Sequence, residues 1–329
     1  MSSFPSDVFN DFTVVAIPTR TNFRGITMRE AALFRGAQGW SEFSPFIEYD
    51  DAESSAWLGA AVEASQKPWP HLFRREIEVN ATLPQVPVEE VAGILDRFPG
   101  STTVKIKVND FASGSELVEA TLDHIPEAKI RLDVNGSWSL KDALLHLYDF
   151  HLRFGNVFEY IEQPCESLDD LKMLKRDVPM KIAVDESIRK NLKSDFAELK
   201  EVADIAIVKW APSGGFTAAH RIAKSAGLPV VVSSALDTGI GISHSLALAA
   251  SFEELDYACG LGTVALLQSD ICEPALIPEN GRLEVKRVEP SEALLMRYRA
   301  SEDRQEWWKN RVSKIWSDHR ERVEKGELA

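Results

Sequence analysis

The sequence contains few cysteines and no two histidines four residues apart. Its 329 residues include three cysteines, which are far apart in the chain: Cys165, Cys259 and Cys272. An odd, scattered set argues against a disulfide framework and against a thiolate metal site, and it favours the reducing cytoplasm. The seven histidines form no His-x-x-x-His or similar pair. A histidine-based metal site is therefore not expected.

Long apolar runs and basic clusters are also missing. No apolar run reaches 18 residues, and the N-terminal Met-Ser-Ser-Phe-Pro-Ser-Asp has neither a basic nor an apolar leader region. We therefore expect no membrane insertion and no signal peptide. The net charge is −14 and no basic stripe stands out, so nucleic-acid binding is not expected. The acidic balance is typical of a surface that favours solubility.

Two kinds of pattern divide the chain. The opening part indicates antiparallel structure: a strand at 11–17, a hairpin at 26–35 and 39–44, and a helix at 50–66. From about residue 75, eight apolar runs alternate with helical segments, which predicts a parallel sheet that closes into a (β/α)7β barrel of the TIM type. The apolar runs lie at 76–81, 103–108, 129–134, 158–162, 181–185, 205–209, 229–234 and 255–259, with helices at 88–97, 115–123, 139–152 and 168–176.

The alternation stops after about residue 275. Residues 281–285 suggest a short strand, and 291–325 suggest a charged helix that carries Trp307, Trp308 and Trp316. We expect these aromatic side chains to pack against the N-terminal region rather than to form an exposed partner surface. The prediction is an α+β capping domain built from both ends of the chain, with segments 1–74 and 276–329 flanking a barrel at 75–275.

Charged residues recur at the ends of the predicted strands. Successive members of the set are 26, 29, 23 and 24 residues apart from Lys107 onward, about one strand–helix unit each. Active sites of (β/α) barrels lie at the C-terminal ends of the strands, so these charges should meet in one place. The set comprises Lys105, Lys107, Asp133, Glu162, Asp185 and Lys209.

Lys105 and Lys107 should point the same way, because side chains alternate along a strand. Two ammonium groups so close, in a desolvated site, are expected to lower each other's pKa. A lysine with a lowered pKa serves as a general base near neutrality. The alternative is a surface strand whose lysines extend into water, but Val104, Ile106 and Val108 indicate burial on the other face.

Asp133, Glu162 and Asp185 are expected to converge in the barrel mouth, where they would repel one another unless a cation lies among them. Hard oxygen ligands without histidine or cysteine suit Mg²⁺, for which Mn²⁺ could substitute. Asn135 and Glu186 could support the ligands. A lone carboxylate would more often be a helix cap or a surface ion pair; three at successive strand ends favour a metal site.

Lys209 should enter the ring from the side opposite Lys107. A cation there could stabilise an enediolate, lie over a ring face, or act as a second base.

These residues carry a resemblance to the enolase superfamily, specifically to its muconate-lactonizing branch with the Lys-x-Lys motif. Within that branch the sequence is most similar to the o-succinylbenzoate synthase family in its actinobacterial form. The resemblance covers essentially the whole length. Its motifs are Lys105-Ile106-Lys107, Asp133-Val134-Asn135-Gly136, Glu162-Gln163-Pro164-Cys165, Asp185-Glu186-Ser187, Lys209 with Gly214-Gly215, Ser233–Thr238 and Ala258–Thr263.

The resemblance implies the roles of the site residues. The three carboxylates would bind Mg²⁺, and the metal would hold a substrate carboxylate and stabilise the enediolate formed beside it. Lys107 would remove the proton and protonate the departing hydroxyl, while Lys209 would stabilise the intermediate. The reaction would be the syn-dehydration of a succinylated hydroxycyclohexadiene carboxylate, driven by aromatisation. In relatives a first-domain loop covers the site; here that loop is Thr21–Gly25, and Arg24 is its candidate substrate contact.

The distal pocket should decide between reactions on this scaffold. Ser233, Ser234 and the backbone of Gly260, Leu261 and Gly262 are expected to face a succinyl tail, because backbone N–H groups suit a carboxylate. Dipeptide epimerases of the branch carry acidic residues at strand 8, which are absent here. An N-succinylamino acid racemase stays open, since Lys107 and Lys209 could supply a base on each face. Mandelate-racemase relatives use a strand-7 histidine where this chain has serine. A non-catalytic barrel remains a remote alternative.

Overall fold

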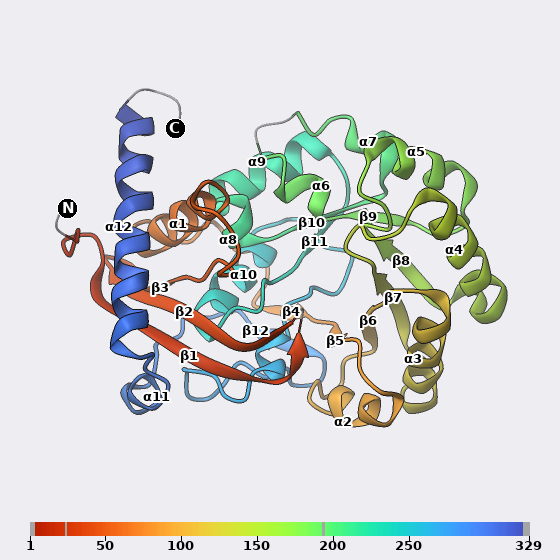
Figure 1. Cartoon of the computed structure of the whole chain (residues 1–329), viewed down its shortest axis with the longest axis horizontal. Coiled ribbons are helices and arrows are strands. Elements are labelled where there is room, and N and C mark those ends of the chain that lie inside the picture. The colour runs from red at the N-terminus through yellow and green to blue at the C-terminus, as the bar shows by residue number, and fades with distance from the viewer. Residues whose placement is uncertain (1–3, 24, 193–194, 325–329) are drawn as a thin grey trace.

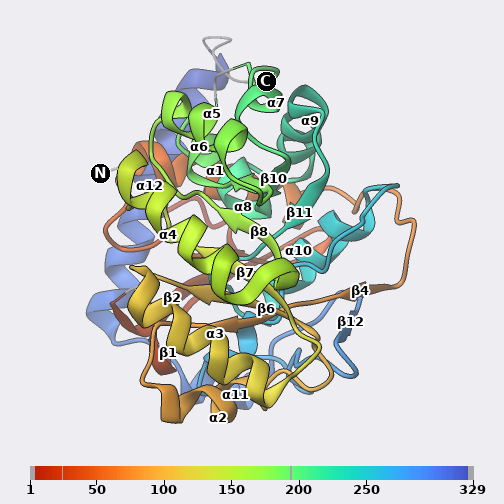
Figure 2. The ribbon, with the colours of Figure 1, turned by 90° about the vertical axis from the view of Figure 1, so that its right-hand side faces the viewer.

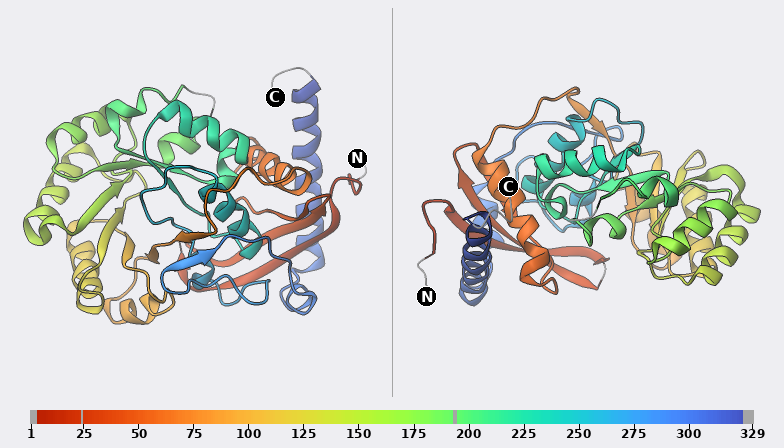
Figure 3. Two further views of the ribbon diagram at one scale, coloured as in Figure 1. Left: turned by 180° about the vertical axis from the view of Figure 1, so that it is seen from behind. Right: turned by 90° about the horizontal axis from the view of Figure 1, so that it is seen from above.

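A curled parallel sheet and a separate N-terminal capping domain make up the protein. The structure is a computed structural model that describes residues 4–23, 25–192 and 195–324. Figure 1 shows the capping elements on one side and the curled sheet with its helices on the other. Seen from above, the helix α12 and the strands beside it lie at one end of the molecule, and the helices that cover the parallel sheet lie at the other (Figure 3). The fold class predicted from the sequence is confirmed.

The cap is built on a three-stranded antiparallel sheet of order β1-β2-β3. Its strands are β1 (Asn10–Phe23), β2 (Ile26–Gly36) and β3 (Gly39–Phe43), followed by helix α1 (Asp51–Gln66). The Asp50 side chain caps α1 by accepting a hydrogen bond from the backbone N–H of Glu53. From here on, the cap means β1–β3, α1 and the C-terminal helix α12.

The parallel sheet has seven strands in the order β11-β10-β9-β8-β7-β6-β5. The strands are short and rich in β-branched residues, as expected for strands buried on both faces. Helices cover the outer face, and Figure 2 shows α3 and α4 in front of it. The strands are β5 (Ala81–Leu83), β6 (Thr103–Lys107), β7 (Lys129–Asp133), β8 (Phe158–Glu162), β9 (Ile182–Val184), β10 (Ile205–Val208) and β11 (Val230–Val232).

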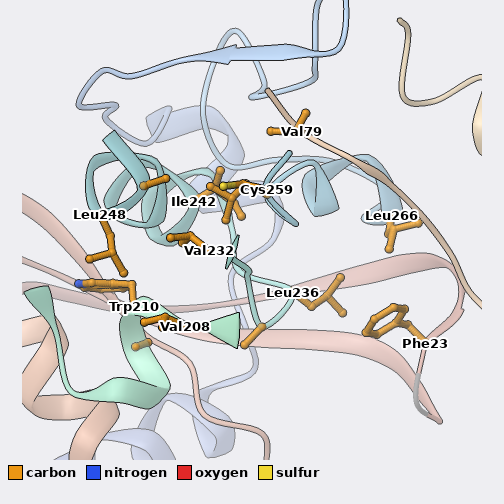
Figure 4. Packing of buried hydrophobic residues seen from close by; sticks show 14 of the residues in the cluster. Phe23, Val79, Val208, Trp210, Val232, Leu236, Ile242, Leu248, Cys259 and Leu266 are labelled. Atoms are coloured by element: carbon orange, nitrogen blue, oxygen red, sulfur yellow. The ribbon is translucent and has the colours of Figure 1, made fainter. Parts of the chain in front are cut away.

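Of the intervening helices, α6–α10 were not predicted individually, whereas α2–α5 match the four segments predicted from periodicity. Side chains of Asp110, Ser139 and Ser167 cap three of them by accepting backbone N–H bonds. Figure 4 shows part of the core, including Val232 of β11 with Ile242 and Leu248 of the wholly buried α10. The helices are α2 (Val91–Leu95), α3 (Phe111–His124), α4 (Leu140–Phe154), α5 (Leu168–Asp177), α6 (Glu186–Arg189), α7 (Leu199–Val202), α8 (Trp210–Ser213), α9 (Phe216–Ala226) and α10 (Gly239–Ala250).

The first predicted barrel run, 76–81, is divided between two sheets. Residues Glu76–Glu78 form β4, which pairs antiparallel with β12 (Arg282–Glu284) outside the barrel. The barrel begins only at β5. The prediction that 76–81 forms one continuous barrel strand is therefore wrong.

The eighth predicted run, 255–259, is not a strand. Cys259 and Gly260 instead make single bridges, to Val79 and Ser233 respectively. The Cys259 N–H donates to Glu78 O at 2.7 Å, and the Gly260 N–H donates to Val232 O at 2.8 Å. The chain then turns, with Leu261 N donating to Cys259 O at 2.9 Å, so too few residues remain for a ladder. These bridges join β11 to the segment before β5 and close the ring.

The predicted C-terminal helix 291–325 is two helices, α11 (Glu292–Arg297) and α12 (Glu302–Glu324). The backbone between them pairs with β1 instead: Ala16 N donates to Tyr298 O at 2.7 Å, and Ala300 N donates to Val14 O at 2.9 Å. These bonds replace the helical bonds that a continuous helix would make.

The tryptophans of α12 pack on the cap, as predicted. Trp308 contacts Phe43 edge to face at 5.7 Å between ring centroids, and Trp316 contacts Phe9 at 5.6 Å. The Trp308 Nε1–H also donates to Glu30 at 2.7 Å. Among the described helices, none combines the length and apolar character that crossing a bilayer requires.

Candidate active site

Strand register brings the predicted charges to one level of the barrel. Lys107 pairs with Asp133 across β6 and β7, and Asp133 pairs with Glu162 across β7 and β8. Asp185 and Lys209 directly follow β9 and β10, the next strands of the sheet. Parallel strands end at the same edge, so all of these side chains lie at the C-terminal rim.

The lysines and carboxylates are in direct contact. The buried Lys105 Nζ lies 3.1 Å from Glu162 Oε2 and 3.3 Å from Asp133 Oδ2. Lys107 Nζ donates to Asp133 Oδ2 at 2.9 Å and to Asn135 Oδ1 at 2.7 Å. Lys209 Nζ donates to Asp185 Oδ2 at 2.7 Å. Each of the three carboxylates therefore has at least one lysine partner.

These contacts reverse the pKa expected for Lys105. Burial alone lowers the pKa of Lys105, but attraction to Glu162 and Asp133 outweighs burial and raises it above its ordinary value. The prediction that the lysine pair lowers its pKa is therefore wrong for Lys105. Its ammonium is a fixed positive charge beneath the rim.

The pKa values of the three carboxyl groups shift in different directions. Burial and the nearby Asp133 raise the pKa of Glu162 to about 7, although Lys105 opposes this. Burial also acts to raise the pKa of Asp133, but Lys107 and Lys105 hold it below its usual range. Asp185 follows the same logic: Lys209 and Arg189 overcome burial and lower its pKa. Negative charge is thus crowded around Glu162, where a further cation would be favourable.

The carboxylate oxygens of Asp133, Glu162 and Asp185 suit a hard divalent cation, although their side chains are not arranged as a complete metal site. Across residues 4–23, 25–192 and 195–324, no group of three or more His, Cys, Asp or Glu side chains is arranged to hold a metal ion. Lysine ammonium groups contact the carboxylates instead. Within the same residues the buried Oδ1 of Asp133 has no hydrogen-bond partner. An unpaired carboxylate oxygen, on the residue that pairs with Glu162 across β7 and β8, fits the hard-oxygen chemistry of Mg²⁺.

The two predicted supporting residues contact each other and the charged ring. Asn135 Nδ2 donates to Glu186 Oε1 at 3.2 Å, while its Oδ1 accepts from Lys107. Glu186 also accepts from Arg189 at 3.0 Å. Gln163, quoted only as part of a motif, is fully buried, and its Oε1 accepts from Asp185 N at 3.1 Å and from Ser187 N at 3.2 Å. It thereby fixes the backbone that carries Asp185.

A pocket opens above this ring, and the predicted distal residues divide between its wall and the core. Ser233, Ser234 and Gly260 line the pocket with both catalytic-candidate lysines, Lys107 and Lys209. Leu261 is buried in the core, and Gly262 lies beside Phe98 and Pro278. Arg24 lies outside the described residues.

The cap supplies pocket walls, of which sequence analysis indicated only Phe23, in the Thr21–Gly25 loop that was expected to cover the site. Glu53 and four aromatic side chains come from the cap and the segment between its sheet and helix, while Arg189, Thr82, Pro212 and Thr263 come from the barrel side. The periodicity of a strand or helix indicates which of its faces is buried, but not which part of the chain packs against that face. No local sequence pattern therefore indicated that the other cap residues line the pocket. The aromatic residues are Phe23, Phe46, Tyr49 and Trp57.

Arg189 did carry a local signal. It lies four residues after Asp185 on the short helix α6, the spacing that brings side chains together on one face. Its guanidinium lies 3.8 Å from Asp185, 3.0 Å from Glu186 and 3.1 Å from Glu53 of the cap. It therefore connects the two units at the pocket edge.

Comparison with known families agrees with this geometry. The family described as "Enolase N-terminal domain-like" matches residues 14–65, and "Enolase C-terminal domain-like" matches residues 89–290. The fold is similar to that of muconate lactonizing enzyme from Pseudomonas fluorescens in complex with muconolactone. The TM-score is 0.72 with 21% identity, over 88% of this chain and 98% of that one.

Two curated relatives are closer in sequence. The o-succinylbenzoate synthase of Thermobifida fusca (strain YX) is 46% identical over 287 residues, covering 85% of this chain and 89% of that protein. The o-succinylbenzoate synthase of Mycolicibacterium smegmatis is 42% identical over 310 residues, covering 93% and 95%. A capped, curled parallel sheet with charges at successive strand ends defines a member of the enolase superfamily. Within it, the chain belongs to the o-succinylbenzoate synthase family.

Proposed function

We propose that the protein is an o-succinylbenzoate synthase, a hydro-lyase of menaquinone biosynthesis. It would dehydrate 2-succinyl-6-hydroxy-2,4-cyclohexadiene-1-carboxylate to o-succinylbenzoate. The observation that carries the proposal is the 42–46% identity to curated o-succinylbenzoate synthases over most of both chains. The lysines and carboxylates at the rim supply the chemistry this reaction needs.

Lys107 is the proposed base. The elimination breaks the C–H bond beside the ring carboxylate and the C–O bond of the neighbouring hydroxyl, and it leaves a new double bond and one water. Lys107 would take the proton and return it to the hydroxyl as that group departs from the same face. Its Nζ lines the pocket and already contacts Asp133 and Asn135, which hold it in place. Because the product is aromatic, one well-placed base is enough.

Lys209 is proposed to stabilise the negative charge that forms when the proton is removed. Its ammonium is fixed by Asp185 at 2.7 Å and faces the same pocket. A preorganised charge in a buried site is more effective than one in water. Lys105 would keep the carboxylate ring together from below.

Asp133, Glu162 and Asp185 are the proposed ligands of Mg²⁺, which Mn²⁺ could replace, with Asn135 and Glu186 supporting them. When bound, the ion would supply positive charge at the substrate carboxylate. Support comes from the all-oxygen donor set and from the unpaired Asp133 Oδ1.

Ser233, Ser234 and Gly260 are proposed to face the succinyl tail, with Arg24 as a further candidate. The expected contribution of Leu261 and Gly262 is not kept, because Leu261 is buried in the core and Gly262 lies beside Phe98. The serine hydroxyls suit a terminal carboxylate, whereas the backbone N–H groups of Gly260 and Leu261 already donate to Val232 and Cys259. Residues 258–263 carry no acidic side chain that would bind an ammonium.

The remaining proposals concern the whole protein. We propose domain segments at 1–74, 75–275 and 276–329. The three cysteines are free and buried, which supports a cytoplasmic location without disulfides. The proposed partner is the small-molecule substrate, with no nucleic acid and no membrane insertion.

Comparison of three substrates tests the function. With Mg²⁺ present, kcat/KM should be high for the succinylated cyclohexadiene, low for an N-succinylamino acid, and undetectable for a dipeptide. The first two share the tail, so their ratio reports the chemistry, and the dipeptide reports the tail pocket. A higher kcat/KM for the dipeptide or the N-succinylamino acid would contradict the synthase assignment.

A further inference from the structure

A buried arginine of the cap holds the loop that follows β11. Arg29 of β2 is only 3% exposed. Its Nε donates to Leu236 O at 2.9 Å, and one Nη donates to Ala235 O at 3.2 Å. That Nη also donates to the backbone and hydroxyl oxygens of Ser44, back in the cap. A single guanidinium therefore joins two consecutive carbonyls of the barrel loop to the cap.

Glu42 of β3 holds the same loop two residues further on. It is 1% exposed and accepts from the Thr238 hydroxyl at 2.6 Å, from Thr238 N at 3.2 Å and from Gly241 N at 3.0 Å. On the cap side it accepts from the Ser44 hydroxyl at 2.6 Å. Ser44 thus connects Arg29 and Glu42, and the loop from Ala235 to Gly241 is fastened to the cap at both ends.

The fastened loop forms one wall of the pocket. Ser233, Ser234, Ala235 and Leu236 all line it. Leu236 has φ +62°, a left-handed conformation that residues with a side chain rarely adopt. Its carbonyl is the one that Arg29 Nε binds, so the arginine supports the strained residue directly.

The same guanidinium supports a second wall. It lies over the Phe46 ring at 4.7 Å from the ring centroid, and Phe46 lines the pocket from the cap side. Leu236 and Phe23 also line it, and Figure 4 shows them on the segment after β11 and at the end of β1. Arg29 therefore contacts both the barrel wall, at Ala235 and Leu236, and the cap wall, at Phe46. Its position determines how far apart the two walls lie.

We propose that Arg29, assisted by Glu42, is a positioning residue that fixes the pocket wall formed by Ser233–Leu236 against the cap and so determines affinity for the substrate's succinyl tail. This deepens the proposed function and rests on it. Arg29 does not line the pocket, so it acts through the loop. Losing it should weaken tail binding equally in the bound substrate and in the transition state, because the tail takes no part in the chemistry.

The test replaces Arg29 by Met and by Lys, with Arg304→Met as the matched control. Arg304 is a second cap arginine, and it pairs with Glu30, next to Arg29, at 2.7 Å on the α12 side. In the Mg²⁺-loaded enzyme, Arg29→Met should raise KM about tenfold while kcat stays within about threefold, the pattern of lost uniform binding. Arg29→Lys keeps the charge and should recover part of the affinity. Arg304→Met should lower Tm without changing KM.

Two ligands separate tail binding from general damage. Dissociation constants measured by calorimetry should rise about tenfold for o-succinylbenzoate in Arg29→Met and stay unchanged for benzoate, which lacks the tail. If Arg29→Met does not fold, Thr238→Val removes the hydroxyl bond to Glu42 and should raise the o-succinylbenzoate constant in the same selective way.

Three results would overturn the inference. A folded Arg29→Met or Thr238→Val enzyme with unchanged KM is one. A fall in kcat at constant KM is another, since it would indicate a catalytic or merely structural effect. Equal weakening for both ligands is the third. A wild-type protein that neither turns over the cyclohexadiene nor binds o-succinylbenzoate would overturn the proposed function itself, and the tail assignment with it.

Discussion

Each charged side chain at the barrel rim shares its partner with another, so single substitutions should differ in their effects. Asp133 Oδ2 contacts both Lys105 and Lys107. Removing Lys107 leaves Asp133 paired with Lys105, whereas removing Asp133 would leave the buried Lys105 and the partly buried Lys107 with one partner fewer. Breaking a buried pair is costly mainly when a charge is left uncompensated.

Lys107→Ala should abolish most activity with little loss of stability. A positioned general base contributes about 10²–10⁴-fold to rate, and Lys105 still neutralises Asp133 in the variant. Steady-state kcat and Tm, measured with Mg²⁺, check both parts. Lys172→Ala, which removes an exposed ion pair with Glu201, is the control. Near-normal kcat in Lys107→Ala would require a different base.

Glu42 should make stability fall as pH rises. Burial and Asp237 raise its pKa from 4.5 to about 7 in the folded protein. The folded state therefore binds a proton more tightly than the unfolded state between about pH 4.5 and 7. Its stabilising contribution is full below that window and is lost as pH rises through 7. Urea unfolding at pH 5 and pH 8 should show a larger drop for wild type than for Glu42→Gln. An equal drop would mean that Glu42 titrates normally.

Residue types at strand ends could be predicted because a parallel barrel brings every strand end to one rim. Asp133, Glu162 and Asp185 needed only the strand–helix period. The burial of Arg29 could have been suspected, since Arg29 lies on the same face of β2 as the buried Ala31 and Leu33. Its barrel partners, Ala235 and Leu236, could not, because they lie 206 and 207 positions away in the sequence. The direction of the Lys105 pKa shift could not be predicted either, because the carboxylates that surround Lys105 come from other strands.

Short elements decide how the barrel closes. Six of the seven barrel strands, β6–β11, could be predicted because their apolar runs are rich in β-branched residues and recur at regular spacing. The 255–259 run, Leu-Asp-Tyr-Ala-Cys, contains no β-branched residue and is interrupted by Asp256. Its pairing rests on two single bridges. The gap between α11 and α12 likewise depends on β1, nearly 290 residues earlier, and no local signal reports such pairing.

Gly260→Ala should raise KM by displacing Ser233. A Cβ at position 260 would lie 2.5 Å from Ser233 Oγ and 3.2 Å from its Cβ. Both residues line the pocket, so the serine would have to move away from the tail. An increase of about tenfold in KM, with kcat less affected, is the expected result. Gly93→Ala on α2 is the control, because a Cβ there meets nothing within 4 Å. Unchanged KM in Gly260→Ala would show that this wall adapts.

At the scale of the whole molecule, folding and catalysis should depend differently on metal. The core extends through both units, and one apolar cluster includes residues of cap and barrel together. The rim carboxylates already have lysine partners without a metal ion. We therefore expect the folded structure to rest on burial of apolar residues, and the activity to depend on the proposed metal ion.

EDTA should abolish turnover and leave the circular dichroism spectrum nearly unchanged. Added Mg²⁺ should restore activity, and Mn²⁺ should restore part of it. The spectrum of the EDTA-treated protein, compared with that of an untreated sample at the same pH, is the control for folding. Full turnover after rigorous removal of divalent metal would contradict the proposed ligand role of the three carboxylates.

The helix α12 has a consequence for the order of events during synthesis. It covers the cap from its far side: Gln305 exchanges two hydrogen bonds with Val14 of β1, and Arg311 donates to Tyr49 O at 2.5 Å. Tyr49 is one of the aromatic residues that line the pocket. A ribosome makes every barrel strand before it makes α12, so a nascent chain would carry its rim lysines and carboxylates while the aromatic side of the pocket still lacked its backing. The pocket would therefore be ready to bind substrate only after α12 has been made and has packed against β1.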